Sequence, residues 1–320
     1  MLNASIDGLL FSSLSGYNMY TPSKYDSSMI HVLSNTEVTI KPVPKINSID
    51  IEQMWRDLIY MPIDIKSITW PIDILELDNQ TTGLVFRKRA FPKMEPLKNL
   101  LYNSDLLDWE KPSIKKLINN LLRVFNEIHS GGYLYRAFDM NHIYYNESSY
   151  EILIDFSIAT SQNKVFSIKP NIPVESVSIE FLPPWLSFSN RTDTTMTDEL
   201  YSVAAMLFRL MVGRMPYQGR LMDGHGDIMD RFRDVDPSEH IHMFEYYHDN
   251  PVFIFSPINK TNSIGQVTSE EKFKNRWKKL PESIRKMFLH VFDEKHLTSE
   301  NRDFYSVQEW IDALSQEQII

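Results

Sequence analysis

The sequence predicts an α+β protein with two lobes, a small β-rich N-terminal lobe (residues 1–90) and a large helical C-terminal lobe (residues 91–320). Short runs rich in β-branched and aromatic residues, separated by turn signals, fill the first lobe. The second lobe contains long stretches whose apolar residues recur at helical spacing. A connector near residues 87–96 joins the two parts, and a cleft between such lobes is the favoured place for a ligand.

Strands dominate the expected N-terminal lobe. The runs EVTIKPVP (residues 37–44), SITWPIDILEL (67–77) and TGLVFRKRA (82–90) have strand composition. The turn DNQT (78–81) lies between the last two and predicts a hairpin. One helix is expected over residues 48–57, with Ser48 as N-cap and apolar residues at helical spacing behind it.

The clearest helix of the C-terminal lobe is PSIKKLINNLLRVFNEIHSGG (residues 112–132), which Pro112 begins and two glycines end. A second strong helix, residues 197–213, has a capping pattern at Thr197 and stops at Gly213. The other expected elements are short strands at 142–146 and 151–156, an irregular insert at about 214–265, and helices at 270–280, 281–292 and 306–318.

Composition limits the class of protein. The net charge of −9 disfavours general binding to nucleic acid, because an acidic surface repels phosphate backbones. The absence of cysteine excludes disulfides and cysteine-ligated zinc, and favours a reducing compartment. The N-terminus has no basic region before its short apolar run, and no window approaches 18 uninterrupted apolar residues. We therefore expect a cytoplasmic protein without a membrane partner.

Motifs along the chain resemble those of protein kinases. The stretch EIHSGGYLYRAFDMNHIYY (residues 127–145) resembles the helix and catalytic loop of that family. The other matching stretches are VTIK (38–41) for the strand that ends in a phosphate-binding lysine, IDFS (154–157) for the metal-binding DFG motif, FLPPWL (181–186) for the end of the activation segment, DELYSVAAMLFRLMVGRMPYQG (198–219) for the following helix, and NRDFYSVQEW (301–310) for the closing motif. The resemblance implies a bilobal protein-kinase-like fold.

A closer resemblance is to a branch of bacterial serine/threonine kinase-like proteins. That branch shows a WP.D.L strand followed by G..F, and much later HDPVFIFDP.N..N and RW..LP..IR..F. The corresponding stretches here are residues 69–86, 248–262 and 275–292. The resemblance implies protein partners that carry phosphatase or von Willebrand-type domains.

The catalytic loop departs from the family pattern at the positions that chemistry needs. Tyr135, Arg136 and Ala137 stand for the His-Arg-Asp triplet, so alanine replaces the catalytic base. Loss of a positioned base costs on the order of 10²–10⁴ in rate. His142 takes the place of the metal-ligand asparagine and is a poor Mg²⁺ ligand, because hard cations prefer oxygen. Asp155 follows Ala137 by 155 − 137 = 18 residues, a separation typical of the family.

The glycine-rich phosphate cover of kinases is also missing. The stretch FSSLSGYNMYTPSKY (residues 11–25) offers only Gly16, whereas close approach of backbone to phosphate needs glycines in series. With the base, the second metal ligand and the cover all changed, the sequence predicts a catalytically impaired pseudokinase that acts as a binding or regulatory scaffold.

The resemblance also implies which residues would hold ATP and Mg²⁺. Lys41 would meet phosphate with Glu52 as its acidic partner, although Asp57 is a rival for that role. Phe86 would line the nucleotide site, and Asp155 would hold one Mg²⁺.

The alternative hypothesis is an active atypical phospho- or nucleotidyl-transferase that uses Lys41, Asp139 and Asp155 with ATP and a divalent metal. In this hypothesis Asp139 replaces the missing base. The competing interpretation of Asp139 is that it stands where the kinase loop has a lysine, near solvent or phosphate.

Three further expectations concern structure. Asp198 should accept backbone N–H bonds from the catalytic loop. Trp185 stands where kinases have a glutamate that pairs with the arginine matched by Arg302, so apolar packing should replace the ion pair. Within the insert, the aromatic run 242–255 is either a docking patch or core, and the histidines of the insert are loop and core residues rather than a metal site. Those histidines are His225, His240, His242 and His248.

Overall fold

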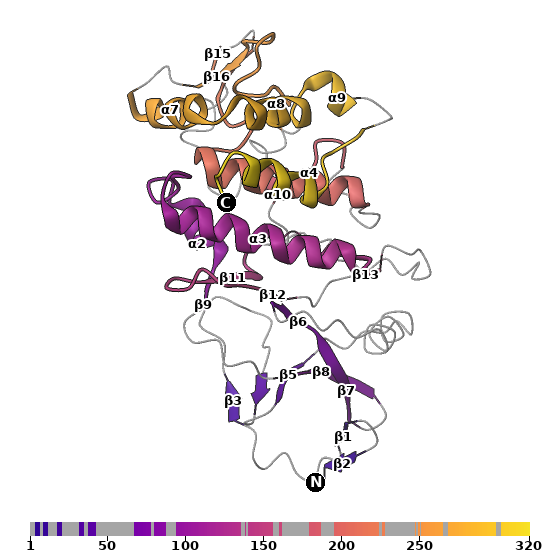
Figure 1. Cartoon of the computed structure of the whole chain (residues 1–320). Helices are drawn as coiled ribbons and strands as arrows, with labels where there is room; N and C mark the ends of the chain where they lie inside the picture. The colour runs from indigo at the N-terminus through magenta and orange to yellow at the C-terminus, as the bar shows by residue number, and fades with distance from the viewer. Residues whose placement is uncertain are drawn as a thin grey trace.

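The fold is known from a computed structural model of the chain (Figure 1). It describes residues 67–70, 94–135, 138, 140–154, 180–186, 195–220, 247, 249, 251–264, 268–297 and 302–320 in full. It gives the backbone alone for strands at 4–6, 9–11, 18–20, 32–34, 38–42, 71–77 and 80–87, and for residues 155, 160–161, 179, 221–223, 226–227 and 298. The helix expected over residues 48–57 lies outside the described residues.

The N-terminal strands form one antiparallel sheet at the lower end of Figure 1. Its seven strands follow the order β2-β1-β7-β8-β5-β4-β3. Their bounds are β1 Ala4–Ile6, β2 Leu9–Phe11, β3 Asn18–Tyr20, β4 Val32–Ser34, β5 Val38–Pro42, β7 Pro71–Leu77 and β8 Gln80–Arg87. The expected hairpin is confirmed, because β7 and β8 pair from Leu77 with Gln80 to Pro71 with Phe86.

Helices make up most of the remaining chain and stack in layers above the sheets in Figure 1. Their bounds are α2 Leu97–Tyr102, α3 Pro112–Ser130, α4 Met196–Val212, α7 Glu271–Lys279, α8 Glu282–Val291, α9 Glu294–Thr298 and α10 Val307–Gln316, with the short 3₁₀ helices η2 Ile179–Phe181 and η5 Thr268–Glu270. None of the helices in the described part of the chain has the length and hydropathy that a membrane crossing requires.

The expected helix at 112–132 is confirmed as α3. Pro112 occupies the first turn, where a missing N–H costs nothing, and the predicted apolar stripe is buried. Gly132 has φ +80°, a conformation that other residues rarely adopt, and so the chain turns sharply into the next strand.

Helix α4 is the centre of the helical lobe. Apolar side chains are buried around its whole circumference, as expected for a helix enclosed by others. It begins two residues earlier than the capping pattern at Thr197 predicted, because Thr195 is the N-cap and forms a reciprocal capping box with Asp198. It ends as expected at Gly213, whose φ is +87°.

A second sheet lies between the helices and the N-terminal sheet (Figure 1). Its order is β6-β12-β11-β9, with β6 Ile68–Thr69, β9 Met94–Pro96, β11 Ile143–Asn146 and β12 Ile152–Asp155. The expected strands at 142–146 and 151–156 are β11 and β12, which form an antiparallel hairpin.

The insert at 214–265 contains regular structure that the sequence did not predict. A small three-stranded sheet forms from β14 Arg220–Asp223, β15 Gly226–Asp227 and β16 Asn262–Ser263. The described members of the aromatic run 242–255 are mostly core. Tyr247, Val252, Phe253 and Ile254 are buried, and Phe253 packs edge-on against Phe208 of α4. The described part of the run therefore supports the core interpretation rather than a docking patch.

Candidate functional site

The strand β12 brings Asp155 to the junction of the two sheets. Asp155 is its last residue and aligns with Thr69 of β6, which runs parallel to it. The Ile154 N–H donates to the Ser67 carbonyl at 2.8 Å, and the Thr69 hydroxyl donates to the Ile154 carbonyl at 3.3 Å. The expected metal-binding aspartate thus ends a strand that is bonded to β6 on one edge and to β11 on the other.

The segment whose sequence resembles a kinase catalytic loop lies between β10 (Tyr133–Leu134) and β11. Phe138 is buried and stacks on Phe125 of α3 with ring centroids 5.3 Å apart. Its φ of +38° is uncommon for a residue with a side chain, so this packing must stabilise an unfavourable backbone conformation. The Met140 carbonyl accepts the Lys98 N–H at the start of α2 at 3.1 Å. The loop is therefore fixed to the helical core at several points.

A buried carboxylate of α4 supports the start of this loop, but it belongs to Glu199 and not to Asp198. Glu199 is 1% exposed, and its Oε1 accepts the Tyr135 N–H at 3.0 Å and lies 2.7 Å from His129 Nε2. Among the described residues, Asp198 bonds instead to Trp185 Nε1 at 2.6 Å and to the N–H and hydroxyl of Thr195.

Among the described residues of this loop, the backbone N–H that meets a carboxylate of α4 bonds to Glu199, one residue further along the chain than the expected Asp198. Since Thr195 begins α4, Asp198 is the third residue of the first turn and its side chain folds back onto the N-cap. Glu199 is longer by one methylene and points into the lobe, where it reaches the loop. The only feature of the sequence that could have indicated this role for Glu199 is the pair of acidic residues at the start of an apolar helix.

The expectation that apolar packing replaces the ion pair at Trp185 also needs correction. The Arg302 guanidinium lies over the Trp185 ring, 4.4 Å from its centroid, in a cation–π contact. Arg302 Nε donates to the Leu297 carbonyl at 2.8 Å. The Phe304 ring also stacks on Trp185, with ring centroids 5.5 Å apart. The positive charge of Arg302 therefore interacts with the Trp185 ring instead of with a carboxylate.

The sequence-predicted nucleotide residues fall on the N-terminal sheet. Lys41 lies on β5 opposite Leu84 of β8, and Phe86 lies on β8 opposite Thr39. Side chains alternate along a strand, so Lys41 and Phe86 occupy positions that share one face of the sheet. Glu52 and its rival Asp57 lie outside the described residues.

Three loop residues that matter for catalysis, Arg136, Ala137 and Asp139, also lie outside the described residues. The contacts of this loop are therefore known from Tyr135, Phe138 and Met140 only. His142 is described and half-buried, directly before β11.

A cavity of about 130 Å³, lined by both polar and apolar side chains, opens beside the loop, between α2, η2 and the end of α4. Met140 and Glu180 line it together with Tyr102 and Arg209. The Tyr102 hydroxyl donates to Glu180 at 2.8 Å, and desolvation of that hydroxyl, followed by the negative charge of Glu180, raises the Tyr102 pKa above its usual range. Burial lowers the pKa of Arg209 to about 10, which leaves a charged guanidinium at neutral pH.

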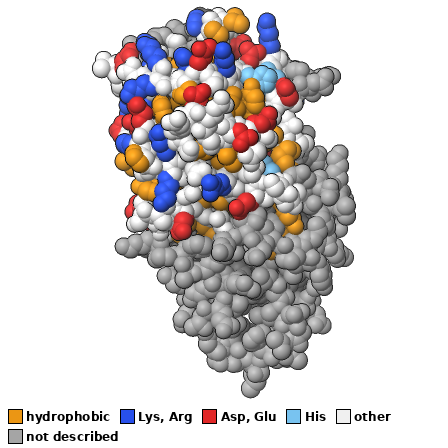
Figure 2. Space-filling view, in the orientation of Figure 1, with side chains coloured by type: hydrophobic (Ala, Val, Ile, Leu, Met, Phe, Trp, Pro, Cys, Tyr) orange, Lys and Arg blue, Asp and Glu red, His pale blue; other side chains and the backbone are white. Residues whose placement is uncertain are grey.

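The described surface carries no single field of charge on the face drawn in Figure 2. Acidic and basic side chains are interspersed over the helical lobe there, as expected for a protein of modest negative charge.

A lysine lies on a paired strand of the first sheet, a hairpin ends in aspartate, and a carboxylate of α4 binds the chain that follows β10. This arrangement is that of a protein-kinase-like fold. Comparison with solved structures supports this class. The chain is similar to one in the yeast RNA Pol II CTD kinase CTDK-1 complex, with a TM-score of 0.51 and 15% sequence identity over 93% of this chain and 91% of that one. At this identity the likeness shows the fold alone. No family model matches the sequence, and no curated protein matches it either.

Proposed function

We propose that this chain is a pseudokinase, a kinase-fold protein that binds partners and has lost efficient phosphoryl transfer. The observation that carries the proposal is the alanine at position 137, where the motif alignment with kinases expects the catalytic base. Contacts of Tyr135 with Glu199, of Phe138 with Phe125 and of Met140 with Lys98 hold the chain on either side of position 137. In the proposal, the group that would take the proton of an acceptor hydroxyl is absent.

The strand topology adds support for this proposal. The hairpin β3–β4 pairs with β5, which carries Lys41, and in the proposal it stands for the phosphate cover of kinases. The connection between these strands, residues 21–31, contains no glycine. Side chains along a cover hold backbone away from phosphate, so tight gripping of a triphosphate is disfavoured.

Several residues nevertheless fit a weakly bound nucleotide. Lys41 and Phe86 share a face of the sheet, and Asp155 ends β12 beside the junction of the sheets. In the proposal Lys41 meets the phosphates, Phe86 lines the base site and Asp155 holds a single Mg²⁺. The metal would neutralise phosphate charge, and ATP would serve as a structural ligand.

The proposed biological setting rests on resemblance. The motifs shared with the bacterial kinase-like branch support a cytoplasmic scaffold whose partners carry phosphatase or von Willebrand-type domains. Pull-down from a bacterial host followed by mass spectrometry tests that part, and enrichment of neither domain type would count against it.

A pair of assays on the full chain tests the proposal. The melting temperature is measured with ATP and Mg²⁺ or Mn²⁺, and radiolabel transfer from γ-labelled ATP is measured to the chain itself and to a generic acceptor protein. We expect no transfer above the level of the Asp155→Ala variant, with or without a thermal shift. Lys41→Ala should abolish any thermal shift that ATP produces.

Transfer that disappears in Asp155→Ala would overturn the pseudokinase proposal. The active-transferase alternative would then hold, and Asp139→Asn would show whether Asp139 supplies the base. Loss of transfer in Asp139→Asn but retention in the matched variant Asp312→Asn, an exposed carboxylate on α10, would assign that role.

A further inference from the structure

Two imidazole rings and one carboxylate meet where α8, α9 and the approach to α10 come together. His290 lies in the last turn of α8, His296 lies in α9 and Asp303 lies three residues before the N-cap of α10. One ligand atom from each of the three lies within 4.8 Å of the others. A spacing of 296 − 290 = 6 residues does not match the i, i+4 pair of a zinc-binding helix, so the sequence did not indicate this cluster.

Two of the three separations in this cluster are close to those around one small ion. His296 Nε2 lies 2.9 Å and His290 Nε2 lies 3.5 Å from Asp303 Oδ1. Neighbouring ligand atoms in a tetrahedral site with bonds of about 2.0–2.1 Å are roughly 3.3 Å apart. The observed distances lie on either side of that value. His290 Nε2 also lies 3.3 Å from the Asp303 carbonyl, a contact that an ion would displace. The Asp303 side chain is 85% exposed and free to adjust by a few tenths of an ångström.

The hydrogen bonds of His296 prepare its Nε2 as a ligand. Its Nδ1 lies 3.0 Å from the His290 carbonyl, and because a carbonyl only accepts, Nδ1 carries the hydrogen. Metal-bound histidines generally donate their second ring nitrogen to a carbonyl or carboxylate in this way. The lone pair of Nε2 is then directed toward the groups around Asp303.

This Nε2 atom has an electrostatic conflict that a cation would relieve. The Asp303 N–H points at Nε2 at 3.1 Å, so a proton on Nε2 would meet another hydrogen. Without a proton, the lone pair faces the Asp303 carboxylate oxygen at 2.9 Å, and both are electron-rich. A metal ion between these two atoms removes the repulsion and displaces the amide contact.

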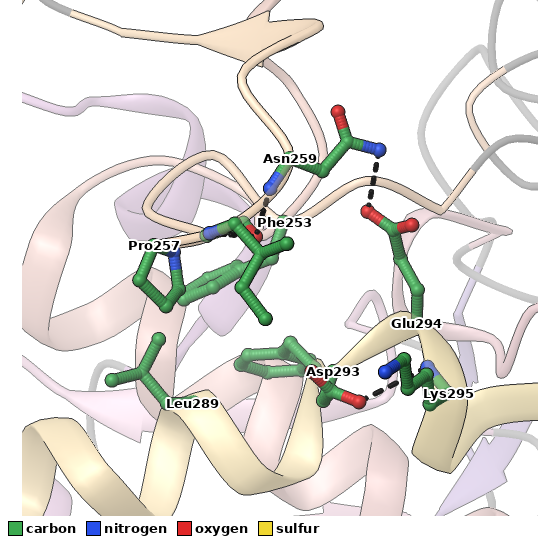
Figure 3. Close-up of a pocket in the computed structure, with 10 residues that line it drawn as sticks. Phe253, Pro257, Asn259, Leu289, Asp293, Glu294 and Lys295 are labelled. Atoms are coloured by element: carbon green, nitrogen blue, oxygen red, sulfur yellow. Dashed lines mark hydrogen bonds between the residues drawn. The ribbon is translucent and has the colours of Figure 1, made fainter.

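The positions of the histidines are fixed by the turn between α8 and α9. Asp293 begins that turn, and its Oδ1 accepts the N–H groups of Lys295 at 3.0 Å and of His296 at 3.3 Å (Figure 3). Asn259 reaches across from the insert and donates to Glu294 at 2.9 Å, which holds the start of α9 from the other side. The adjoining cavity measures about 50 Å³, room for a few water molecules only.

We infer that His290, His296 and Asp303 bind one divalent transition-metal ion, with zinc as the best fit and water completing the coordination. Two imidazoles and one carboxylate suit zinc, cobalt or nickel, whereas Mg²⁺ requires oxygen ligands. The role is structural. The ion joins α8, α9 and the segment that carries Arg302 and Phe304, both of which lie against Trp185.

Zinc titration of the chelator-treated full chain tests this inference. Isothermal titration at pH 7.5 should give one site, and zinc at about 100 times its Kd should raise the melting temperature by about 4 °C. Mg²⁺ at the same concentration should give no shift. Cobalt in place of zinc should give the visible absorption of a low-symmetry nitrogen and oxygen site.

Two variants that keep shape remove single ligands. His290→Phe preserves a ring beside His296, whose centroid is 4.3 Å away, and Asp303→Asn preserves the size of the side chain. Each should weaken zinc binding at least tenfold and remove the cobalt spectrum. Asp312→Asn, an exposed carboxylate of α10, is the matched control and should bind as the natural chain does.

Absence of zinc binding, or equal zinc affinity in His290→Phe and Asp303→Asn, would overturn the inference. Equal affinity would assign the ion to another group of histidines. Urea unfolding in the presence of chelator checks that each variant folds, because the metal-free stability of Asp303→Asn should remain close to that of the natural chain.

Discussion

Replacement of Glu199 by alanine should release the catalytic-like loop from α4. The carboxylate is buried, and its Oε1 holds both the Tyr135 N–H and His129. A hydrogen bond to a charged acceptor contributes about 1.5–3 kcal/mol, and removing one member of a buried polar cluster costs about 3–5 kcal/mol. The Tyr135 amide should therefore exchange with solvent roughly 10- to 150-fold faster, since each 1.4 kcal/mol is tenfold.

Native-state hydrogen exchange measures this effect, with the amides of α10 as an internal reference. The matched variant is Asp198→Ala, one residue earlier on the same helix. It loses a cap worth about 1 kcal/mol and the bond to Trp185, but it leaves the Tyr135 amide bonded. Faster exchange of that amide in Asp198→Ala and unchanged exchange in Glu199→Ala would refute the assignment of Glu199.

Three other substitutions probe the supporting structure by urea unfolding. Trp185→Phe should destabilise the chain by about 1–2 kcal/mol, because phenyl cannot donate to Asp198 and is a weaker cation–π partner; an unchanged midpoint would show that both contacts are energetically silent. Gly213→Ala should cost about 1 kcal/mol more than Gly132→Ala. Both have positive φ, but a Cβ at 213 lies 3.2 Å from Phe273 whereas one at 132 meets nothing within 4 Å, so equal losses would contradict this packing argument. Asn262→Asp should cost about 3 kcal/mol, because its amide nitrogen donates to two buried carbonyls that a carboxylate would repel, while the half-buried Asn126, whose amide bonds to the Gln308 side chain, should tolerate Asn126→Asp with little change in stability.

The sequence predicted well the helices whose apolar residues form a stripe along one face, and the helix that is apolar on all sides. The helices α3, α7, α8 and α10 follow from their stripes, and α4 follows from an apolar stretch between a cap and Gly213. The short helix α9 and the strands β14 to β16 have no periodic signal of their own. Helix α9 begins at a local cap, in which Asp293 accepts the His296 N–H. At β16, Asn262 bonds to the carbonyls of Tyr217 and Val252, which tertiary packing brings near.

The candidate site shows the same division. The motifs correctly predicted that Lys41 and Asp155 lie on strands, because a strand can be recognised from the local sequence alone. From the sequence, Asp198 was expected to hold the loop and Glu199 had no predicted role, because which of two adjacent carboxylates reaches the loop depends on where the helix begins. The contact of Arg302 with Trp185 joins residues 302 − 185 = 117 positions apart, and no local pattern encodes a meeting of that range.

The pairing of β12 with β6 gives the Asp155 backbone a mechanical tie to residues that precede the inter-lobe connector. If one half of the molecule tilts against the other, this aspartate must travel with Ser67 and Thr69 unless their two bonds break. A force applied to residues 67–70 would thus also move the C-terminal end of β12. Two residues of parallel strand are enough to transmit such a pull.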